Sequence, residues 1–110
     1  MATEVNWSER ASQNLHHIYD YISFDSHFYA ERFVTKLISS VEKQLVSQPL
    51  SGRNIPEFKD TRLDFLREII FKGYRIIYNP TNSPLKVTVI AVLNAKMDVP
   101  KHFNEPWIIE

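Results

Sequence analysis

Two charged residues of a predicted β-hairpin are the best candidates for chemistry in this sequence. Lys72-Gly73 lies between two apolar segments, and a two-residue turn ending in glycine is typical of a hairpin. Counting from this turn pairs Ile70 with Arg75 and places Glu68 diagonally opposite Arg75 on the same sheet face. The two side chains either satisfy each other as an ion pair, or Arg75 projects toward a phosphate or carboxylate, which a guanidinium group binds well.

The other polar residues form no pattern that is specific for catalysis or metal binding. Alternation places Arg67 on the opposite sheet face from Glu68 and Arg75. No serine nucleophile or pair of catalytic carboxylates can be singled out, and with only 2 glycines the chain has no glycine-rich phosphate loop. One histidine, at position 102, follows the last predicted strand, where it is either solvent-exposed or available as a general acid or base. The spacing of the histidines does not suit a metal ion, so no metal site is expected: His16, His17, His27 and His102.

Two amphipathic helices precede this hairpin in the sequence. Residues 4–7 predict a short edge strand, and Ser8 is the expected N-cap of a helix that runs to residue 22. Asp25 or Ser26 caps a second helix, which Pro49 ends. Because only a few residues separate the two helices, we expect an antiparallel helical hairpin with an apolar stripe on each helix.

A loop and three strands are predicted after the helices. The last strand is apolar on both sides, which suits a central position in a sheet. Runs of helices followed by runs of strands indicate an α+β fold, in which an N-terminal strand, an antiparallel helical hairpin and a three-stranded antiparallel meander form one sheet-based domain. The loop is expected at 49–60, and the strands at 63–71, 74–78 and 85–93. We expect the helices to pack on the sheet face that carries Val87, Val89 and Ala91.

Length and composition indicate a single cytoplasmic domain, residues 1–110. The chain is 44% hydrophobic and 24% charged, which is the balance of a globular protein. It has no cysteine, no apolar run long enough for a membrane span and no signal peptide. The net charge is zero, but residues 53–101 hold 9 basic and 5 acidic side chains. This basic excess is either a solvated surface or a patch that meets a nucleic acid or an acidic partner.

Four stretches, taken in order, resemble the RelE/ParE superfamily of toxins from bacterial type II toxin–antitoxin pairs. Each stretch alone is degenerate, but their order and spacing are fairly specific, and they cover residues 4–103, with 104–110 left as a terminal segment. The resemblance implies a four-stranded sheet packed on a helical hairpin, in agreement with the periodicity. The stretches are Val5-Asn6-Trp7-Ser8; Gly52-Arg53 with Ile55-Pro56-Glu57; Leu66-Arg67-Glu68-Ile69 with Gly73-Tyr74-Arg75-Ile76; and Val89-Ile90-Ala91-Val92-Leu93-Asn94.

This resemblance implies one of two activities, neither of which uses a cofactor. RelE-like members are metal-independent endoribonucleases that cut messenger RNA on the ribosome, whereas ParE-like members inhibit DNA gyrase. For a ribonuclease, the resemblance makes the catalytic candidates Arg67, Arg75, Lys96 and His102. For a ParE-like toxin, the candidates for binding the target or an anion are Arg67, Glu68, Arg75, Asn94 and Lys96.

The sequence departs from the nuclease pattern at several positions and is more similar to the ParE branch. Glu68 stands where RelE-like strands carry a lysine, and Ala95 stands where a basic residue follows the last strand. His102-Phe103 replaces the histidine–tyrosine ending of other nuclease members, and Asn94 stands where ParE-like chains often have histidine. We therefore expect a ParE-like gyrase inhibitor, with a ribosome-dependent ribonuclease as the alternative.

A protein partner is also implied by the resemblance. The resemblance implies that a small, partly disordered cognate antitoxin neutralises the toxin in a hetero-oligomer, and the basic excess of residues 53–101 predicts that this antitoxin is acidic. A second alternative is a degenerate, non-toxic member of the superfamily that only binds its antitoxin.

Overall fold

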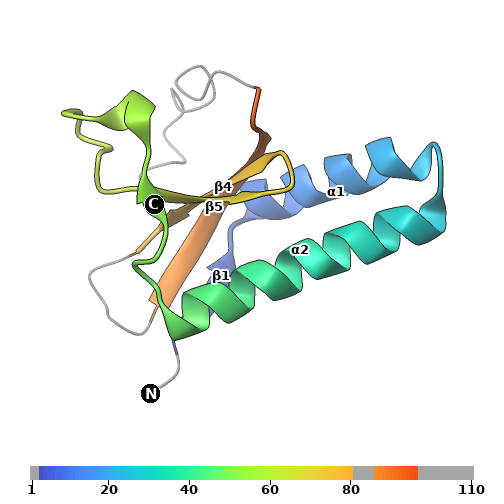
Figure 1. Ribbon diagram of the computed structural model, residues 1–110, viewed down its shortest axis with the longest axis horizontal. Coiled ribbons are helices and arrows are strands. Elements are labelled where there is room, and N and C mark those ends of the chain that lie inside the picture. The colour runs from blue at the N-terminus through green and yellow to red at the C-terminus, as the bar shows by residue number, and fades with distance from the viewer. Residues whose placement is uncertain (1–2, 81–85, 97–110) are drawn as a thin grey trace.

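The computed structural model describes residues 3–80 and 86–96, which fold into two helices and a five-stranded sheet (Figure 1). The predicted α+β fold is confirmed, with one more strand than expected. The strand order is β1-β5-β4-β3-β2, in which β1 is parallel to β5 and the other pairs are antiparallel. The elements are β1 (Glu4–Trp7), α1 (Glu9–Ser23), α2 (His27–Ser47), β2 (Arg53–Asn54), a 3₁₀ helix (Pro56–Phe58), β3 (Arg67–Phe71), β4 (Tyr74–Asn79) and β5 (Lys86–Asn94).

Serine caps set the start of both helices. The Ser8 hydroxyl accepts a hydrogen bond from the backbone N–H of Ala11 at 3.0 Å, as the sequence predicts. Of the two residues predicted to cap the second helix, Ser26 does so, accepting from the N–H of Tyr29 at 3.0 Å. Helix α2 ends just before Pro49, and α1 and α2 run side by side in opposite directions (Figure 1). None of the helices described is long and apolar enough to cross a membrane.

The hairpin of β3 and β4 has the register that the turn predicts. Ile70 pairs with Arg75, and Glu68 pairs with Ile77. Both turn residues have positive φ, 45° at Lys72 and 88° at Gly73. This is the turn whose twist matches that of two antiparallel strands, and it explains why the register can be read from the sequence.

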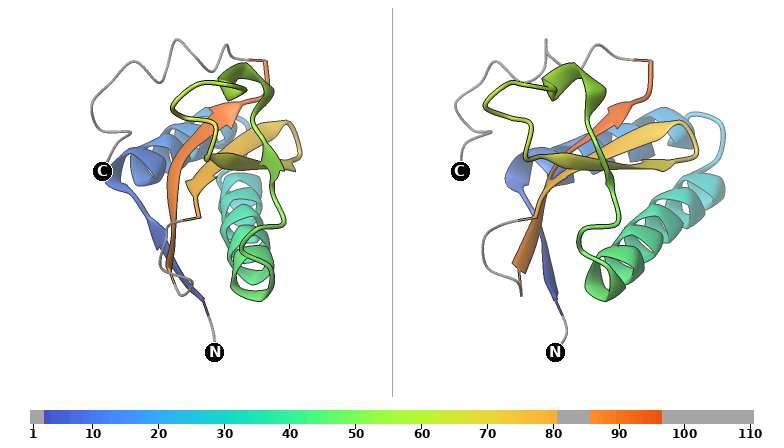
Figure 2. Two further views of the ribbon diagram at one scale, coloured as in Figure 1. Left: turned by 90° about the vertical axis from the view of Figure 1, so that its left-hand side faces the viewer. Right: turned by 60° about the vertical axis from the view of Figure 1, so that its left-hand side comes forward.

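Two apolar clusters cover the two faces of the sheet. The first joins the helices to one face and includes Leu37, Val41, Ile76, Val87 and Val89. The second lies on the other face, where the segment between α2 and β3 packs against β4 and β5. Figure 2 shows this segment, coloured green, rising from the end of α2 beyond the sheet before it returns as β3. The second cluster consists of Ile55, Phe58, Leu66, Ile77, Ile90, Ala91 and Leu93.

A β-bulge in β5 corrects the predicted packing of the helices. Ile77 pairs with Ala91 but the next residue, Tyr78, pairs with Val89, so Ile90 is the extra residue. Alternation is reset there, and Ala91 falls in the second cluster, away from the helices. The prediction that Ala91 shares a face with Val87 and Val89 is therefore wrong, because strict alternation fails at a bulge.

Candidate functional site

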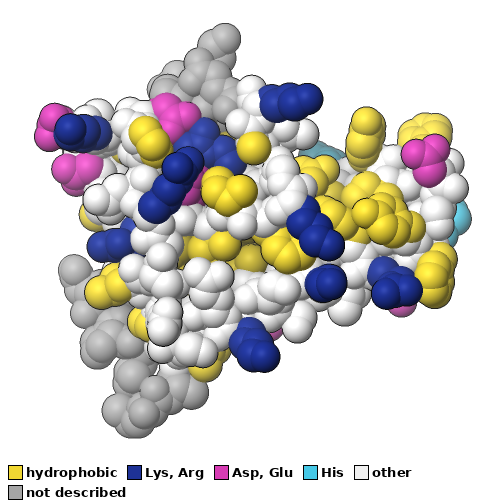
Figure 3. All heavy atoms as spheres, viewed as in Figure 1, with side chains coloured by type: hydrophobic (Ala, Val, Ile, Leu, Met, Phe, Trp, Pro, Cys, Tyr) yellow, Lys and Arg dark blue, Asp and Glu magenta, His cyan; other side chains and the backbone are white. Residues whose placement is uncertain are grey.

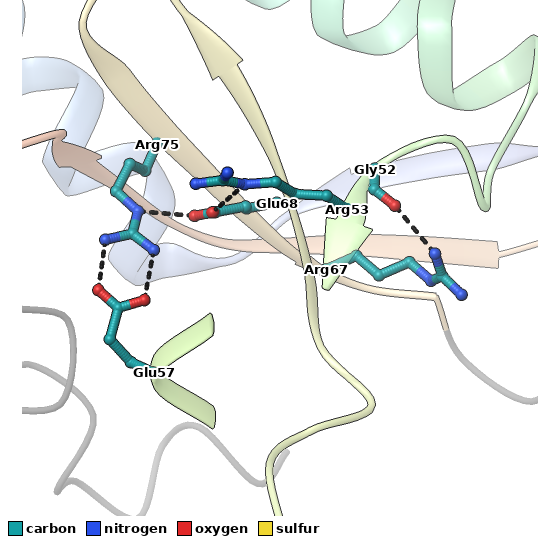
Figure 4. A network of polar contacts seen from close by, with 6 residues as sticks. All are labelled: Gly52, Arg53, Glu57, Arg67, Glu68 and Arg75. Atoms are coloured by element: carbon teal, nitrogen blue, oxygen red, sulfur yellow. Dashed lines mark hydrogen bonds and ion pairs between the residues drawn. The ribbon is translucent and has the colours of Figure 1, made fainter. Parts of the chain in front are cut away.

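Four charged side chains form a connected network on the sheet face opposite the helices (Figure 4). The Arg75 guanidinium donates from Nε to Glu68 Oε1 at 2.6 Å. Its two terminal nitrogens donate to the two carboxylate oxygens of Glu57, at 2.7 and 2.8 Å. Arg53 Nε donates to the remaining oxygen of Glu68, Oε2, at 2.7 Å. Two guanidinium groups thus meet two carboxylates, and the network has no net charge.

Burial divides this network into an inner and an outer part. The Glu68 side chain is 0% exposed and that of Arg75 is 8% exposed, whereas Arg53 is 59% exposed. The hydrogen bonds from Arg75 lower the pKa of Glu57 below its ordinary value of 4.5. The carboxylates of Glu57 and Glu68 raise the pKa of Arg75, whose guanidinium is therefore a permanent cation. Both oxygens of Glu68, both oxygens of Glu57 and all three nitrogens of the Arg75 side chain therefore take part in hydrogen bonds of the network.

Local sequence explains how each part of the network is held. The hairpin register brings Glu68 and Arg75 to one face of neighbouring strands. Pro56 begins the 3₁₀ helix that carries Glu57, and Phe58 anchors that helix in the second apolar cluster. The network therefore links β3 and β4 to the segment between α2 and β3 that packs over them.

A tight contact at Gly52 brings the chain from α2 against the sheet next to Arg53. The Gly52 N–H donates to the buried Tyr78 hydroxyl at 2.8 Å. A Cβ atom at residue 52 would lie 2.5 Å from that hydroxyl oxygen and 2.8 Å from the carbonyl oxygen of Glu68. Glycine is therefore required for this approach. Burial raises the pKa of Tyr78 above its ordinary value of 10.0, so the hydroxyl is protonated at neutral pH.

Arg67 lies apart from this network, as alternation predicts. Its guanidinium points away from Arg75 and Glu68 (Figure 4) and donates to the carbonyl oxygens of Leu50 and Gly52, at 3.2 and 2.9 Å. These bonds hold the backbone of the segment that follows α2. The structure therefore does not bring Arg67 and Arg75 together as a pair of cations.

Asn94 and Lys96 lie beside each other at the end of β5. Asn94 pairs with Tyr74 in the sheet, its side-chain oxygen accepts the N–H of Lys96 at 2.9 Å, and both residues are exposed. Asn94 lines a hollow of about 320 Å³ beneath α1, together with His17 and Tyr74. Burial is the main cause that raises the pKa of Tyr74.

The predicted candidate His102 lies outside the described residues. Within the described residues, no group of acidic or histidine side chains could hold a metal ion.

Sequence reasoning missed the second carboxylate of the network and the outer arginine. Glu57 and Arg53 both lie within a segment that the sequence predicts only as a loop, although the structure forms a short strand and a 3₁₀ helix there. A usable signal was present: Pro56 followed by Glu57 is typical of the first turn of a helix, where an acidic residue is favoured. Its partner across the fold could not be inferred without the tertiary structure.

A family model decides the assignment of this chain. The model described as the ParE toxin of the type II toxin–antitoxin system parDE matches residues 5–99. The chain belongs to the ParE toxin family. No protein of curated function matches this ParE-family sequence at a significant level.

Solved structures share the fold of this ParE-family toxin at low sequence identity. The chromosomal ParDE toxin–antitoxin system from P. aeruginosa matches with a TM-score of 0.69 and 14% identity, over 86% of this chain and 97% of the other. The RelBE2 toxin–antitoxin complex from Mycobacterium tuberculosis matches with a TM-score of 0.64 and 16% identity, over 86% and 99% of the two chains. The isolated E. coli RelE toxin matches with a TM-score of 0.53 and 18% identity, over 92% and 93%. The superfamily resemblance seen in the sequence is confirmed, and the higher score of the ParDE structure agrees with the ParE branch.

Proposed function

We propose that this ParE-family toxin acts on DNA gyrase in the cytoplasm and does not cleave RNA. The observation that carries the proposal is the state of the Arg75 guanidinium, which is buried and donates three hydrogen bonds to Glu57 and Glu68. A guanidinium that already neutralises two carboxylates is not available to stabilise the negative charge that develops on a scissile phosphate.

The remaining requirements for RNA cleavage argue in the same direction. Cleavage without a metal needs a base for the ribose hydroxyl and an acid for the leaving group. Arginine cannot act as the base because its pKa is too high, and Arg67 is bonded to backbone carbonyls on the other sheet face. Glu68 is fully buried and both of its carboxylate oxygens accept hydrogen bonds from arginines, so this position offers no cation to a phosphate.

The family assignment supports a cognate antitoxin as the partner of this chain. ParDE and RelBE are solved as pairs of a toxin with an antitoxin, and their toxin folds match this chain. We infer that this toxin likewise forms a hetero-oligomer with an antitoxin. The absence of such a partner in a pull-down from the native host, under conditions that recover the toxin itself, would count against this part of the proposal.

Induced expression in bacteria, followed by primer extension on several abundant messages, tests the proposal. We expect growth to stop, messages to stay intact and the DNA-damage response to be induced. Codon-phased cleavage of translated messages would instead establish the RelE-like alternative and make Arg67, Arg75, Lys96 and His102 the residues to mutate. Unimpaired growth with well-folded protein would indicate the non-toxic alternative, a chain that only binds its antitoxin.

A further inference from the structure

The hollow between α1 and the end of β5 takes no part in the network of charged residues. It has a volume of about 320 Å³, and its buried lining is apolar, from Ile18 of α1 and from Val92 and Leu93 of β5. Small-molecule sites typically combine such a lining with a few polar groups, in hollows of about 300–1,000 Å³. This hollow therefore has the size and the lining of a site for a small ligand.

Polar and aromatic side chains border this hollow from both the helix and the sheet. Asn14, His17 and Tyr21 are spaced by three and four residues, so they lie on one face of α1. Tyr74 of β4 and Asn94 of β5 border the hollow from the sheet. Helix and sheet thus present two carboxamides, one imidazole and two phenols to the same space.

The two asparagines of this hollow keep hydrogen-bond donors available. The side-chain oxygen of Asn14 accepts the N–H of Val92 at 3.0 Å, and that of Asn94 accepts the N–H of Lys96 at 2.9 Å. These bonds fix which end of each carboxamide is the oxygen. Within the described part of the chain, neither NH2 group has an acceptor, and each is a donor. A matching ligand therefore presents acceptors, such as carbonyl oxygens.

An open aromatic ring stands beside these donors. Figure 3 shows hydrophobic side chains gathered toward the end of the molecule where the two helices turn. Tyr21, in the last part of α1, is 76% exposed. Within the described residues no cation lies over its ring, whereas Arg32 lies over the ring of Phe28, 5.6 Å from the centroid. Nucleic acid bases bind free aromatic faces of this kind by stacking.

The lining of the hollow carries no formal charge. Among the described residues, no aspartate, glutamate, lysine or arginine lines it. A phosphate or a carboxylate that entered would lose its water without meeting a counter-ion. Lys96 is exposed and follows directly on the strand end that carries Asn94. The part of a ligand inside the hollow is therefore neutral, and a phosphate attached to it can lie outside, near Lys96.

We propose that this hollow binds one unstacked nucleobase that presents carbonyl oxygens, as thymine and uracil do. The base stacks on Tyr21, and its carbonyl oxygens accept hydrogen bonds from the carboxamides of Asn14 and Asn94. Adenine fits less well because its amino group is itself a donor. The base could come from DNA or from RNA, so the experiment includes both. The inference holds whether or not the toxin acts on gyrase.

A matched set of probes tests this site on the full chain labelled with nitrogen-15. The probes are thymidine 5′-monophosphate, uridine 5′-monophosphate and adenosine 5′-monophosphate, with deoxyribose 5-phosphate as the control without a base. We expect the thymidine and uridine nucleotides to shift the amide resonances of residues 14–21 and 92–94, and deoxyribose 5-phosphate to leave them unchanged. Hexamers of thymidine and of uridine nucleotides should shift the same resonances, and the tighter of the two identifies the nucleic acid. A neutral tripeptide that contains glutamine represents a protein ligand and should bind more weakly than the nucleotides.

Exposed residues supply matched variants that leave the fold intact. Y21A is expected to weaken binding of thymidine 5′-monophosphate about tenfold, whereas Y29A, at an exposed tyrosine of α2, should have no effect. N94A is expected to weaken it several-fold, whereas N54A, at an exposed asparagine of β2, should not.

Three results would overturn the proposal. The first is equal shifts by deoxyribose 5-phosphate, or shifts that centre on other residues. The second is equal losses of binding in Y21A and Y29A. The third is tighter binding of the adenosine nucleotide or of the tripeptide than of the thymidine and uridine nucleotides.

Discussion

Arg75 and Glu68 are diagonal neighbours on adjacent strands, and the guanidinium Nε donates to the carboxylate at 2.6 Å. Of the two arrangements that the sequence allows, the structure has the ion pair in which both charges are satisfied. Glu57 closes the remaining side of Arg75. Arg75, which the resemblance makes a catalytic candidate for a nuclease, is thus part of a buried network of ion pairs in the fold.

Removing the buried carboxylate should destabilise the protein strongly. Glu68→Gln keeps the shape of the side chain but leaves two arginines facing a neutral group, and we expect a loss of about 3 kcal/mol in the free energy of unfolding. Glu31→Gln, at an exposed residue, is the matched control and should change stability by less than about 0.5 kcal/mol. Urea unfolding measures both. Equal stability of the two variants would show that the ion pair does not hold the sheet face.

The ion pair of Glu57 predicts a loss of stability in acid. The pKa of Glu57 is lower in the folded chain than in the unfolded chain, where it is near 4.5, so acid protonates the unfolded chain first. The stabilisation is complete above that unfolded value and is lost as the pH falls through the lower folded value. Glu57→Gln should remove this part of the acid sensitivity while the rest of the profile remains. An unchanged pH profile of unfolding in that variant would contradict the assignment.

The packing of the helical hairpin predicts a graded response along α2. Leu37 is fully buried in the first apolar cluster, so Leu37→Ala should cost about 2–5 kcal/mol. Phe33 is half-buried, and Phe33→Ala should cost less than Leu37→Ala. Val46 is 40% exposed and serves as the control, with little expected effect. Thermal unfolding of the three variants checks this order, and wild-type stability of Leu37→Ala would refute the packing.

The close approach at Gly52 predicts that even a methyl group is not tolerated. Gly52→Ala should destabilise the protein by about 1–3 kcal/mol because the new Cβ meets both the Tyr78 ring and the Glu68 carbonyl. Removing the hydroxyl with Tyr78→Phe should not rescue the variant, since the backbone contact of 2.8 Å remains. A Cβ atom added at Gly73 would meet no atom within 4 Å, so Gly73→Ala should lower the stability of the protein only through the strain of its positive φ. A full rescue by Tyr78→Phe would show that the hydroxyl contact alone is limiting.

The parts of the fold that follow local rules could be predicted from the sequence. Ser8 and Ser26 cap helices through their own neighbouring backbone, and the Lys72-Gly73 turn fixes the register of its hairpin, so Arg75 and Glu68 were correctly placed together. The bulge at Ile90 and the partnership of Glu57 with Arg75 depend on contacts between segments distant in sequence. Such contacts leave only weak local signals, and these two features became visible in the tertiary structure alone.

The central claim, that this toxin acts on gyrase and not on RNA, is tested most directly with purified gyrase. The toxin is added to relaxed plasmid, gyrase and ATP, and supercoiling and linear DNA are measured on a gel, with the heat-denatured toxin as the control. We expect inhibited supercoiling and a rise in linear DNA, which marks the trapped cleavage complex. Full supercoiling at a molar excess of folded toxin, with cleavage of messenger RNA on ribosomes by the same preparation, would contradict it.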